Sequence, residues 1–115
     1  MTHFRLEDLV DRYKEWSLST FGPGLRTHGI VNHIRMELKE IEDDPLDLME
    51  WIDVILLALD GARRAGFSGR EVEDALIAKQ LINISRKYPE VIAEQTEPIL
   101  HIDPLKEEAI RASRE

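Results

Sequence analysis

Apolar residues recur at helical spacing along most of the chain, and no stretch alternates convincingly between apolar and polar positions. This pattern predicts four helices, over about residues 5–19, 27–43, 45–64 and 68–88. The sequence FGPG at residues 21–24 separates the first two, because Gly and Pro interrupt helices. Four helices with short connections predict an all-α, four-helix bundle-like domain.

Two of the predicted helices begin with recognisable capping residues. Asp44 is expected to cap the third helix, with Pro45 in its first position, where a missing amide hydrogen costs nothing. Ser68 and Glu71 form a capping box at the start of the fourth helix. These signals place turns before the third and the fourth helix.

The helical pattern weakens after Pro89. We therefore expect a helical domain over residues 1–89 and a weakly structured C-terminal tail over residues 90–115. Within the tail, Asp103 and Pro104 are the expected start of a short terminal helix.

The third predicted helix is apolar around nearly its whole circumference, yet Asp53 interrupts the run EWIDVILLALDGA. A helix that is apolar all round is normally buried. A carboxylate in such surroundings costs several kcal/mol unless its charge is compensated. The apolar circumference exceeds what a chain of 115 residues readily covers, so we expect a homo-oligomer, a dimer or larger.

Composition narrows the class of protein. The absence of cysteine excludes disulfides, thiolate metal sites and a cysteine nucleophile, and it is compatible with a reducing cytosol. The sequence has neither a signal peptide nor an apolar run long enough to span a bilayer, so we expect a soluble, cytoplasmic protein. The net charge of −8 disfavours nucleic-acid polymers and acidic membranes as partners. A phosphate-bearing small molecule stays compatible, because divalent cations bridge carboxylates to phosphates.

Acidic residues occur in pairs on the second and third predicted helices. Glu37 and Glu40 lie three residues apart, as do Glu50 and Asp53. The short link around Pro45 predicts an antiparallel hairpin, in which positions equidistant from the turn lie level. Glu40 and Glu50 are each five residues from Pro45, and Glu37 and Asp53 are each eight. The four carboxylates are therefore expected to form a square between the two helices.

Four close carboxylates cannot all stay ionised without cations. Oxygen ligands favour a hard ion, Mg²⁺ or Mn²⁺, over zinc. A ferritin-like di-iron site is disfavoured, because neither Glu37 nor Glu50 is followed by histidine three residues later. The alternative is that these residues are ordinary solvated charges of Glu-rich helices.

Lys79, Asn83 and Arg86 share one face of the fourth predicted helix, continuing the apolar stripe of Val72. Lysine and arginine are natural phosphate ligands, and asparagine can read a base or sugar edge. The alternative is that these cations lie at a helix end because the helix dipole favours them, which explains Arg86 better than Lys79.

Several other residues are weaker candidates. His33 lies one turn before Glu37. It either contacts the metal-binding carboxylates without binding the metal itself, or is a structural histidine. Asp60 is expected to pair with Arg63 or Arg64 instead of binding the same ions. Three aromatic residues could stack on a base, but core packing is the preferred interpretation for each: Trp16, Phe21 and Trp51.

The segments ELKE (Glu37 to Glu40) and EWID (Glu50 to Asp53) resemble the metal motif of the MazG-like all-α nucleoside triphosphate pyrophosphohydrolases. The resemblance is closer to the bacterial and phage dATP/dGTP pyrophosphohydrolases and covers about residues 13–89, ending in AKQLINISRKYP. The nine residues between Glu40 and Glu50 are a shorter link than in many MazG-type proteins.

The resemblance implies Mg²⁺-dependent hydrolysis of a (deoxy)nucleoside triphosphate, dATP or dGTP above all, to the monophosphate and pyrophosphate. By resemblance, metal ligation falls to Glu37, Glu40, Glu50 and Asp53, and substrate binding to Lys79, Asn83 and Arg86. In this mechanism a water activated by the metal attacks phosphorus in line, with one of the glutamates as general base. Two rivals stay open: a non-catalytic helical oligomerisation module with a structural or regulatory metal site, and a phosphatase or nuclease-like hydrolase.

Overall fold

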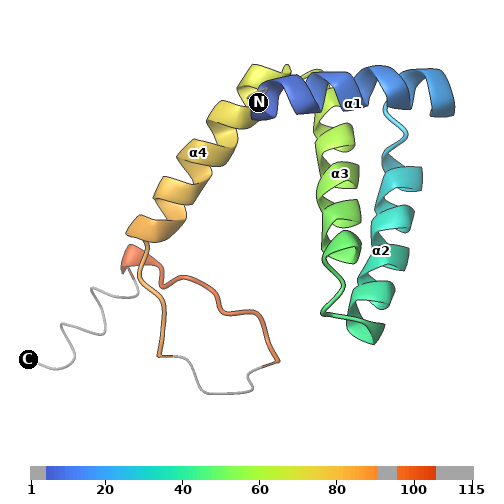
Figure 1. Cartoon of the computed structure of the whole chain (residues 1–115). Helices are drawn as coiled ribbons and strands as arrows, with labels where there is room; N and C mark the ends of the chain where they lie inside the picture. The colour runs from blue at the N-terminus through green and yellow to red at the C-terminus, as the bar shows by residue number, and fades with distance from the viewer. Residues whose placement is uncertain (1–4, 91–95, 106–115) are drawn as a thin grey trace, which may run out of the picture. The chain divides into compact units, whose positions relative to one another are not determined.

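The computed structural model describes residues 5–90 and 96–105. This part of the chain contains four α-helices and no strand, which confirms the all-α prediction (Figure 1). The helices are α1 (Leu6–Phe21), α2 (Thr27–Asp43), α3 (Leu48–Arg64) and α4 (Gly69–Ser85). The chain divides into two units, one reaching Leu76 and the other beginning at Ile77, so that α4 contributes to both. The boundary between domain and tail at residue 89 stays a prediction.

In the first unit, α2 and α3 form the expected antiparallel hairpin (Figure 1). The start of α3 differs from the prediction, because Asp44 and Pro45 belong to the turn. Asp44 caps the end of α2, donating its amide hydrogen to the Glu40 carbonyl at 2.9 Å. The helical conformation is sterically disfavoured for a residue that precedes proline, as Asp44 does, which explains why α2 ends at Asp43. The N-cap of α3 is Asp47, whose Oδ1 accepts a hydrogen bond from the Met49 amide at 3.0 Å.

The predicted capping box at the start of α4 is confirmed. Ser68 Oγ accepts a hydrogen bond from the Glu71 amide at 3.1 Å, and Glu71 Oε1 accepts one from the Ser68 amide at 3.2 Å. Gly69 lies tightly against α1, since a Cβ atom there would stand 2.5 Å from the Glu7 carbonyl oxygen. Its amide donates to Asp11 Oδ1 at 3.1 Å. A residue with a side chain at position 69 would push α4 away from α1.

The core of the first unit is small. Val10 of α1, Leu59 of α3 and Val72 of α4 pack together, while Ile30 and Ile41 are buried on α2. Helix α1 lies across the end of the hairpin that is opposite the 44–47 turn (Figure 1). This arrangement leaves much of α2 and α3 without a covering helix from the first unit.

Core packing was the wrong interpretation for the three large aromatic residues. Trp16, Phe21 and Trp51 are each 49% exposed. The inward face of α1 is centred on Val10 and the fully buried Ser17. Since successive helix residues are rotated by about 100°, Trp16 is turned away from that centre towards the rim of the unit.

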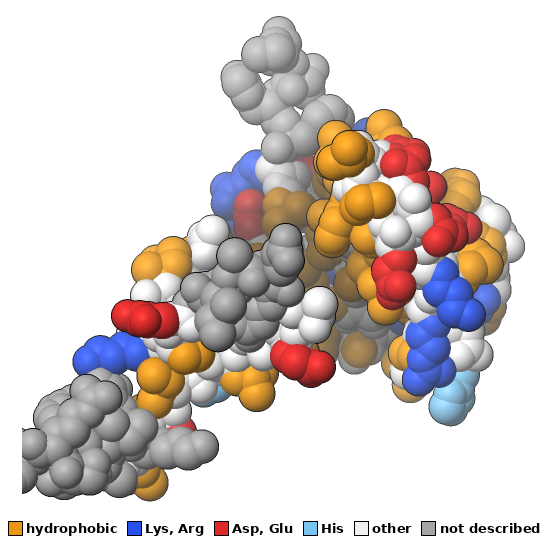
Figure 2. Space-filling view, turned by 90° about the horizontal axis from the view of Figure 1, so that it is seen from below, with side chains coloured by type: hydrophobic (Ala, Val, Ile, Leu, Met, Phe, Trp, Pro, Cys, Tyr) orange, Lys and Arg blue, Asp and Glu red, His pale blue; other side chains and the backbone are white. Residues whose placement is uncertain are grey.

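Asp53 is also exposed, so the expected burial around it does not occur within residues 5–90 and 96–105. The buried residues of α3 are Leu59, Asp60 and Arg64, all in the half of the helix that meets α1. Further apolar side chains of α3 reach the surface, Ile55 among them at 51% exposure. Figure 2 shows hydrophobic side chains at the surface beside acidic ones.

A buried polar network connects α1, α3 and the α1–α2 connection. Arg64 Nε donates to both Asp60 oxygens at 3.2 Å, which confirms the predicted pairing of Asp60 with a nearby arginine. Arg64 also donates to the carbonyls of Gly22 and Gly24, at 2.8 and 2.9 Å. Ser17 Oγ donates to Asp60 Oδ2 and accepts from Arg64 Nη2, each at 2.8 Å. One guanidinium group therefore holds the segment that follows Phe21.

The second unit contains the end of α4 and the described part of the tail. The Ile102 amide donates to the Lys87 carbonyl at 2.7 Å, which brings the tail back beside residues after α4. Asp103 Oδ1 accepts from the Leu105 amide at 2.8 Å, as expected of a residue that begins a helix. The rest of the predicted terminal helix lies outside the described residues. Among the described helices, none has the length and apolar character that crossing a membrane requires.

Candidate metal centre

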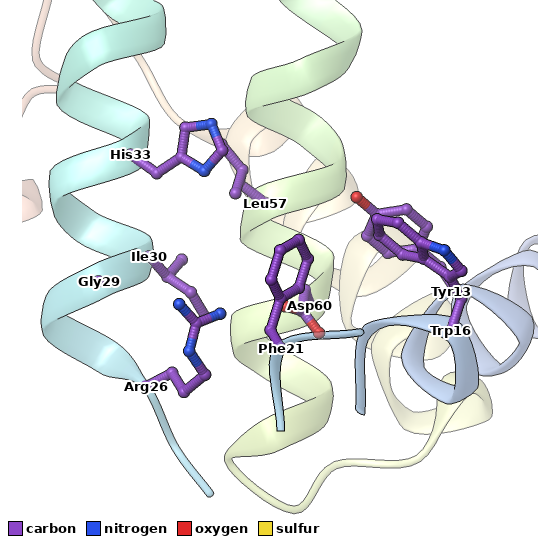
Figure 3. A pocket seen from close by; sticks show the side chains of 9 residues that line it. All are labelled: Tyr13, Trp16, Phe21, Arg26, Gly29, Ile30, His33, Leu57 and Asp60. Carbon is purple, nitrogen blue, oxygen red and sulfur yellow. The ribbon is translucent and has the colours of Figure 1, made fainter. Parts of the chain in front are cut away.

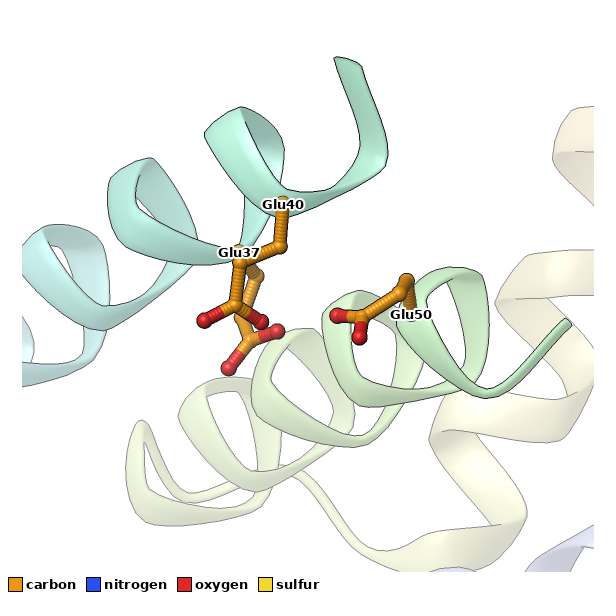
Figure 4. Close-up of side chains that lie close together, drawn as sticks. All are labelled: Glu37, Glu40 and Glu50. Carbon is orange, nitrogen blue, oxygen red and sulfur yellow. The ribbon is translucent and has the colours of Figure 1, made fainter. Parts of the chain in front are cut away.

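Three of the four predicted carboxylates meet between α2 and α3. Glu37 and Glu40 of α2 and Glu50 of α3 each offer an oxygen, and these oxygens lie within 4.8 Å of one another. Figure 4 shows the three side chains pointing into the same space from the two helices. Glu37 is buried, Glu50 is half-buried and Glu40 is exposed. The cluster is therefore open to solvent on the side of Glu40.

The sequence explains why these side chains converge. Glu37 follows Ile30 by seven residues and precedes Ile41 by four, so it lies on the buried stripe of α2. Glu50 stands in the first turn of α3, which the Asp47 cap fixes next to the hairpin turn. The packing of α2 on α3 then turns a polar position on each helix towards the other.

The proximity of the carboxylates raises their affinity for protons. Burial, followed by the hydrogen bond and charge of Glu40, raises the pKa of Glu37 above its ordinary value. A hydrogen bond with Glu40, followed by burial, raises the pKa of Glu50 to about 7. The cluster therefore binds a proton more tightly than separate glutamates would.

The cluster also fits a cation in place of that proton. Glu37 Oε2 and Glu50 Oε2 are buried and meet no hydrogen-bond donor among the described residues. Buried carboxylate oxygens are normally hydrogen-bonded or bound to a metal. Each of these two oxygens therefore has a free lone pair that could bind a cation. The donors in the cluster are all carboxylate oxygens, a set that suits a hard divalent ion.

His33 lies beside the cluster. Its Nε2 is 3.3 Å from Oε1 of Glu37, which lies one turn further along α2. The sequence left open whether His33 contacts a carboxylate of the cluster, and this distance shows that it does. A group that holds one oxygen of a ligating carboxylate orients the other oxygen. His33 is therefore placed to fix the direction of the Glu37 carboxylate.

Asp53 lies one turn beyond Glu50 on α3 and is not among the three residues whose oxygens converge. Its negative charge contributes to the raised pKa of Glu37, so it acts on the cluster electrostatically. Its role as a metal ligand stays a prediction.

The predicted substrate-binding residues all belong to the second unit. Lys79 and Asn83 are exposed, and Arg86 is half-buried. Arg86 Nη1 donates to Asn83 Oδ1 at 3.3 Å, so these two side chains are neighbours, as their spacing on one helix face indicates. Their contact with a substrate stays a prediction.

Sequence reasoning missed a cavity of about 160 Å³ at the α1 end of the hairpin (Figure 3). Its lining includes two residues assigned to the core, Trp16 and Phe21, and one not singled out, Arg26. The available signal was a cluster of aromatic residues just before and within FGPG, followed by a basic residue. Such a cluster does not by itself separate a cavity wall from a core.

Comparisons with known proteins show the family to which the chain belongs. The model of the dATP/dGTP pyrophosphohydrolase family matches residues 9–108. The Eaa protein of Salmonella phage P22 is 37% identical over 104 residues, which cover 90% of this chain and 32% of that protein. The chain thus spans about a third of the length of this relative, and no solved structure matches it significantly. As the ELKE and EWID motifs predicted, the chain belongs to the dATP/dGTP pyrophosphohydrolase family.

Proposed function

We propose that this protein hydrolyses dATP or dGTP to the deoxynucleoside monophosphate and pyrophosphate, with Mg²⁺ as its cofactor and Mn²⁺ as a substitute. The observation that carries the proposal is the convergence of Glu37, Glu40 and Glu50, with two buried oxygens that meet no donor among the described residues. A protein of negative net charge needs such a cation to hold a triphosphate.

In the proposed mechanism Glu37, Glu40, Glu50 and Asp53 hold the metal. When bound, the metal supplies positive charge for the phosphate oxygens and increases the acidity of a nearby water. One of the glutamates accepts a proton from the attacking water, whose oxygen forms a new bond to the α-phosphorus. The bond between the α-phosphorus and the bridging oxygen breaks, and pyrophosphate leaves with the bonding electron pair.

The basic residues of α4 and its C-terminal end are the proposed partners of the substrate. Lys79 and Arg86 would stabilise the charge of the phosphates, as cations do in other phosphoryl transfers. Asn83 would add a hydrogen bond to substrate and, through Oδ1, position Arg86. We place this activity in the cytoplasm, in agreement with a chain that lacks cysteine.

The proposal is tested by incubating the purified protein with each NTP and dNTP in Mg²⁺ and separating the products by chromatography. We expect dAMP from dATP or dGMP from dGTP, each with an equal amount of pyrophosphate, and no product in excess EDTA. Release of orthophosphate and a diphosphate would indicate a phosphatase instead. Failure of every nucleotide to give a monophosphate would overturn the proposal.

We also propose that a second copy of the chain covers the exposed apolar side chains of the hairpin. Leu48, Met49, Trp51 and Ile55 of α3 are 49–67% exposed, whereas monomers rarely expose large contiguous apolar patches. Light scattering after size exclusion should give at least twice the mass of one chain. A mass of one chain at micromolar concentration would contradict the proposal.

These exposed side chains also favour the second candidate, a non-catalytic helical oligomerisation module with a structural or regulatory metal site. That function predicts that Mg²⁺ raises the melting temperature while no nucleotide is cleaved. The product assay above separates the two candidates directly.

A further inference from the structure

The cavity at the α1 end of the hairpin has an aromatic wall. Tyr13 and Trp16 have ring centroids 5.2 Å apart, and Trp16 and Phe21 meet edge to face at 5.4 Å. Trp16 and Phe21 are each 49% exposed although they contact each other. Rings held at a surface in this way can be covered by a flat partner, and base–aromatic stacking is sequence-tolerant because every base has a π-face.

Arg26 closes one side of the cavity in an uncommon backbone conformation. Its φ of 50° makes it the only non-glycine residue with positive φ in the described part of the chain. The guanidinium carbon lies 5.1 Å from the centroid of the Phe21 ring, within the range of a cation–π contact. Strained backbone conformations cluster at ligand sites, where the surrounding structure holds them.

The wall is also fixed from behind. Arg64 holds the carbonyls of Gly22 and Gly24, which flank the turn after Phe21. Asp60 lines the cavity, but both of its oxygens already accept hydrogen bonds from Ser17 or Arg64. Asp60 therefore holds the cavity wall in place. A ligand in the cavity would be recognised mainly by its contacts with the aromatic rings.

His33 connects this cavity to the carboxylate cluster. Figure 3 shows it among the residues that line the cavity. Its Nε2 lies 3.3 Å from Glu37 Oε1. Glu37 is one helical turn further along α2, about 6 Å along the axis. The cavity and the carboxylate cluster are thus neighbours on the same hairpin. One nucleotide could reach both sites, because a single sugar joins its base to its phosphates.

The dimensions suit an aromatic ring system. A cavity of about 150 Å³ is known to hold a benzene-sized ligand. This one measures about 160 Å³ and is open at the surface, so that a larger flat ring can enter with one edge outside. An apolar lining with a few polar groups is typical of small-molecule sites.

We propose that this cavity binds the purine base of the nucleotide, with Trp16 stacking on its rings and Phe21, which stands perpendicular to Trp16, meeting its edge. The assignment rests on the proposed function for the choice of ligand, since the carboxylate cluster would hold the phosphates of the same molecule. Arg26 supports the Phe21 ring and adds positive charge at the rim.

The test uses the fluorescence of Trp16 and needs no hydrolysis. The chain contains two tryptophans, so Trp51→Phe leaves Trp16 as the only one. In Mg²⁺, dAMP or dGMP, which have no pyrophosphate to release, should quench this fluorescence saturably, while 2-deoxyribose 5-phosphate, which lacks a base, should not. The matched control is Trp16→Phe, whose remaining Trp51 should not respond.

A second variant removes the edge contact at the other ring. Phe21→Leu should weaken dAMP binding about 2- to 12-fold, the range expected when one edge-to-face aromatic contact is lost. Circular dichroism should show that both Trp51→Phe and Phe21→Leu keep the helix content of the wild type.

The outcomes distinguish this inference from the proposed function. Saturable purine quenching in a protein that cleaves no nucleotide supports the base site and defeats the hydrolase. Cleavage of dATP with an unchanged KM in Phe21→Leu, and no quenching of Trp16, defeats the base site alone. Equal quenching by the baseless sugar phosphate also overturns it.

Discussion

Replacing Arg64 by methionine removes the guanidinium group that holds the α1–α2 connection. Met has a similar length and is apolar, so the change deletes the charge and its five hydrogen-bond donors without opening a large cavity. The Arg64 side chain is 0% exposed and Asp60 is 5% exposed. The substitution therefore leaves the buried Asp60 carboxylate with the hydrogen bond from Ser17 but without its charged partner.

The size of the effect follows from that burial. Removing one partner of a buried ion pair costs about 3–5 kcal/mol, because the other charge stays buried and uncompensated. The Gly22 and Gly24 carbonyls add less, since their hydrogen bonds with Arg64 are only partly buried. A loss of about 3–5 kcal/mol is a large share of the total stability of a small domain, which is about 5–15 kcal/mol.

Urea unfolding followed by circular dichroism at 222 nm measures this loss. For a slope of about 2 kcal/mol per M, the midpoint should fall by about 2 M in Arg64→Met. The melting temperature should fall by about 12–20 °C, at about 4 °C for each kcal/mol. Arg64→Lys keeps the charge but not the planar fork, so its loss should be intermediate.

The matched control is Arg70→Met. Arg70 pairs with Asp74 at 3.8 Å, but both side chains are more than 60% exposed. Exposed pairs contribute about 1 kcal/mol or less. If Arg64→Met costs no more than Arg70→Met, the buried network does not stabilise the fold as we infer.

Three further predictions concern the carboxylates. Because the pKa of Glu50 is raised from 4.5 to about 7, ionising it destabilises the metal-free fold, so stability is lost as the pH rises from 4.5 through 7. Glu50→Gln should therefore match the wild type in melting temperature at pH 4.5 and exceed it at pH 8; parallel profiles would refute this. His33→Ala should raise the Mg²⁺ concentration for half-maximal rate about 10-fold, since His33 holds Glu37 Oε1; an unchanged Mg²⁺ titration would show that the contact is unimportant. Asp53→Asn should abolish Mg²⁺-dependent turnover and leave the helix content largely intact; full activity would remove Asp53 from the site.

Local signals were sufficient to predict most of the helices. The Ser68–Glu71 capping box and the boundaries of α2 depend on neighbouring residues alone, and the structure confirms them. Pro45 predicted the hairpin turn but not the start of α3. A proline fits both the first position of a helix and a turn, and the competing cap at Asp47 decided between the two.

Burial was harder to predict because it depends on how many helices cover each face. The run around Asp53 is apolar on every side, but helix α3 contacts only α1 and α2 extensively within the described chain, which leaves Asp53 and Ile55 exposed. Trp16 is exposed for the same reason, because the apolar stripe of α1 ends at the rim of the unit. The hairpin symmetry, by contrast, depends only on chain distance from the turn, and it correctly brought Glu37, Glu40 and Glu50 together.

The proposed hydrolysis requires a metal at the carboxylate cluster, and Glu37, the buried member of that cluster, is the position at which to test this requirement. We would follow the formation of dAMP from dATP in Mg²⁺ by the wild type, Glu37→Gln and Glu42→Gln. Glu42 is an exposed carboxylate on the same helix and serves as the matched control. Loss of metal polarisation worth several kcal/mol should slow Glu37→Gln by about 100-fold or more, while Glu42→Gln keeps the wild-type rate. A Glu37→Gln protein that releases dAMP and pyrophosphate at the wild-type rate would contradict the account.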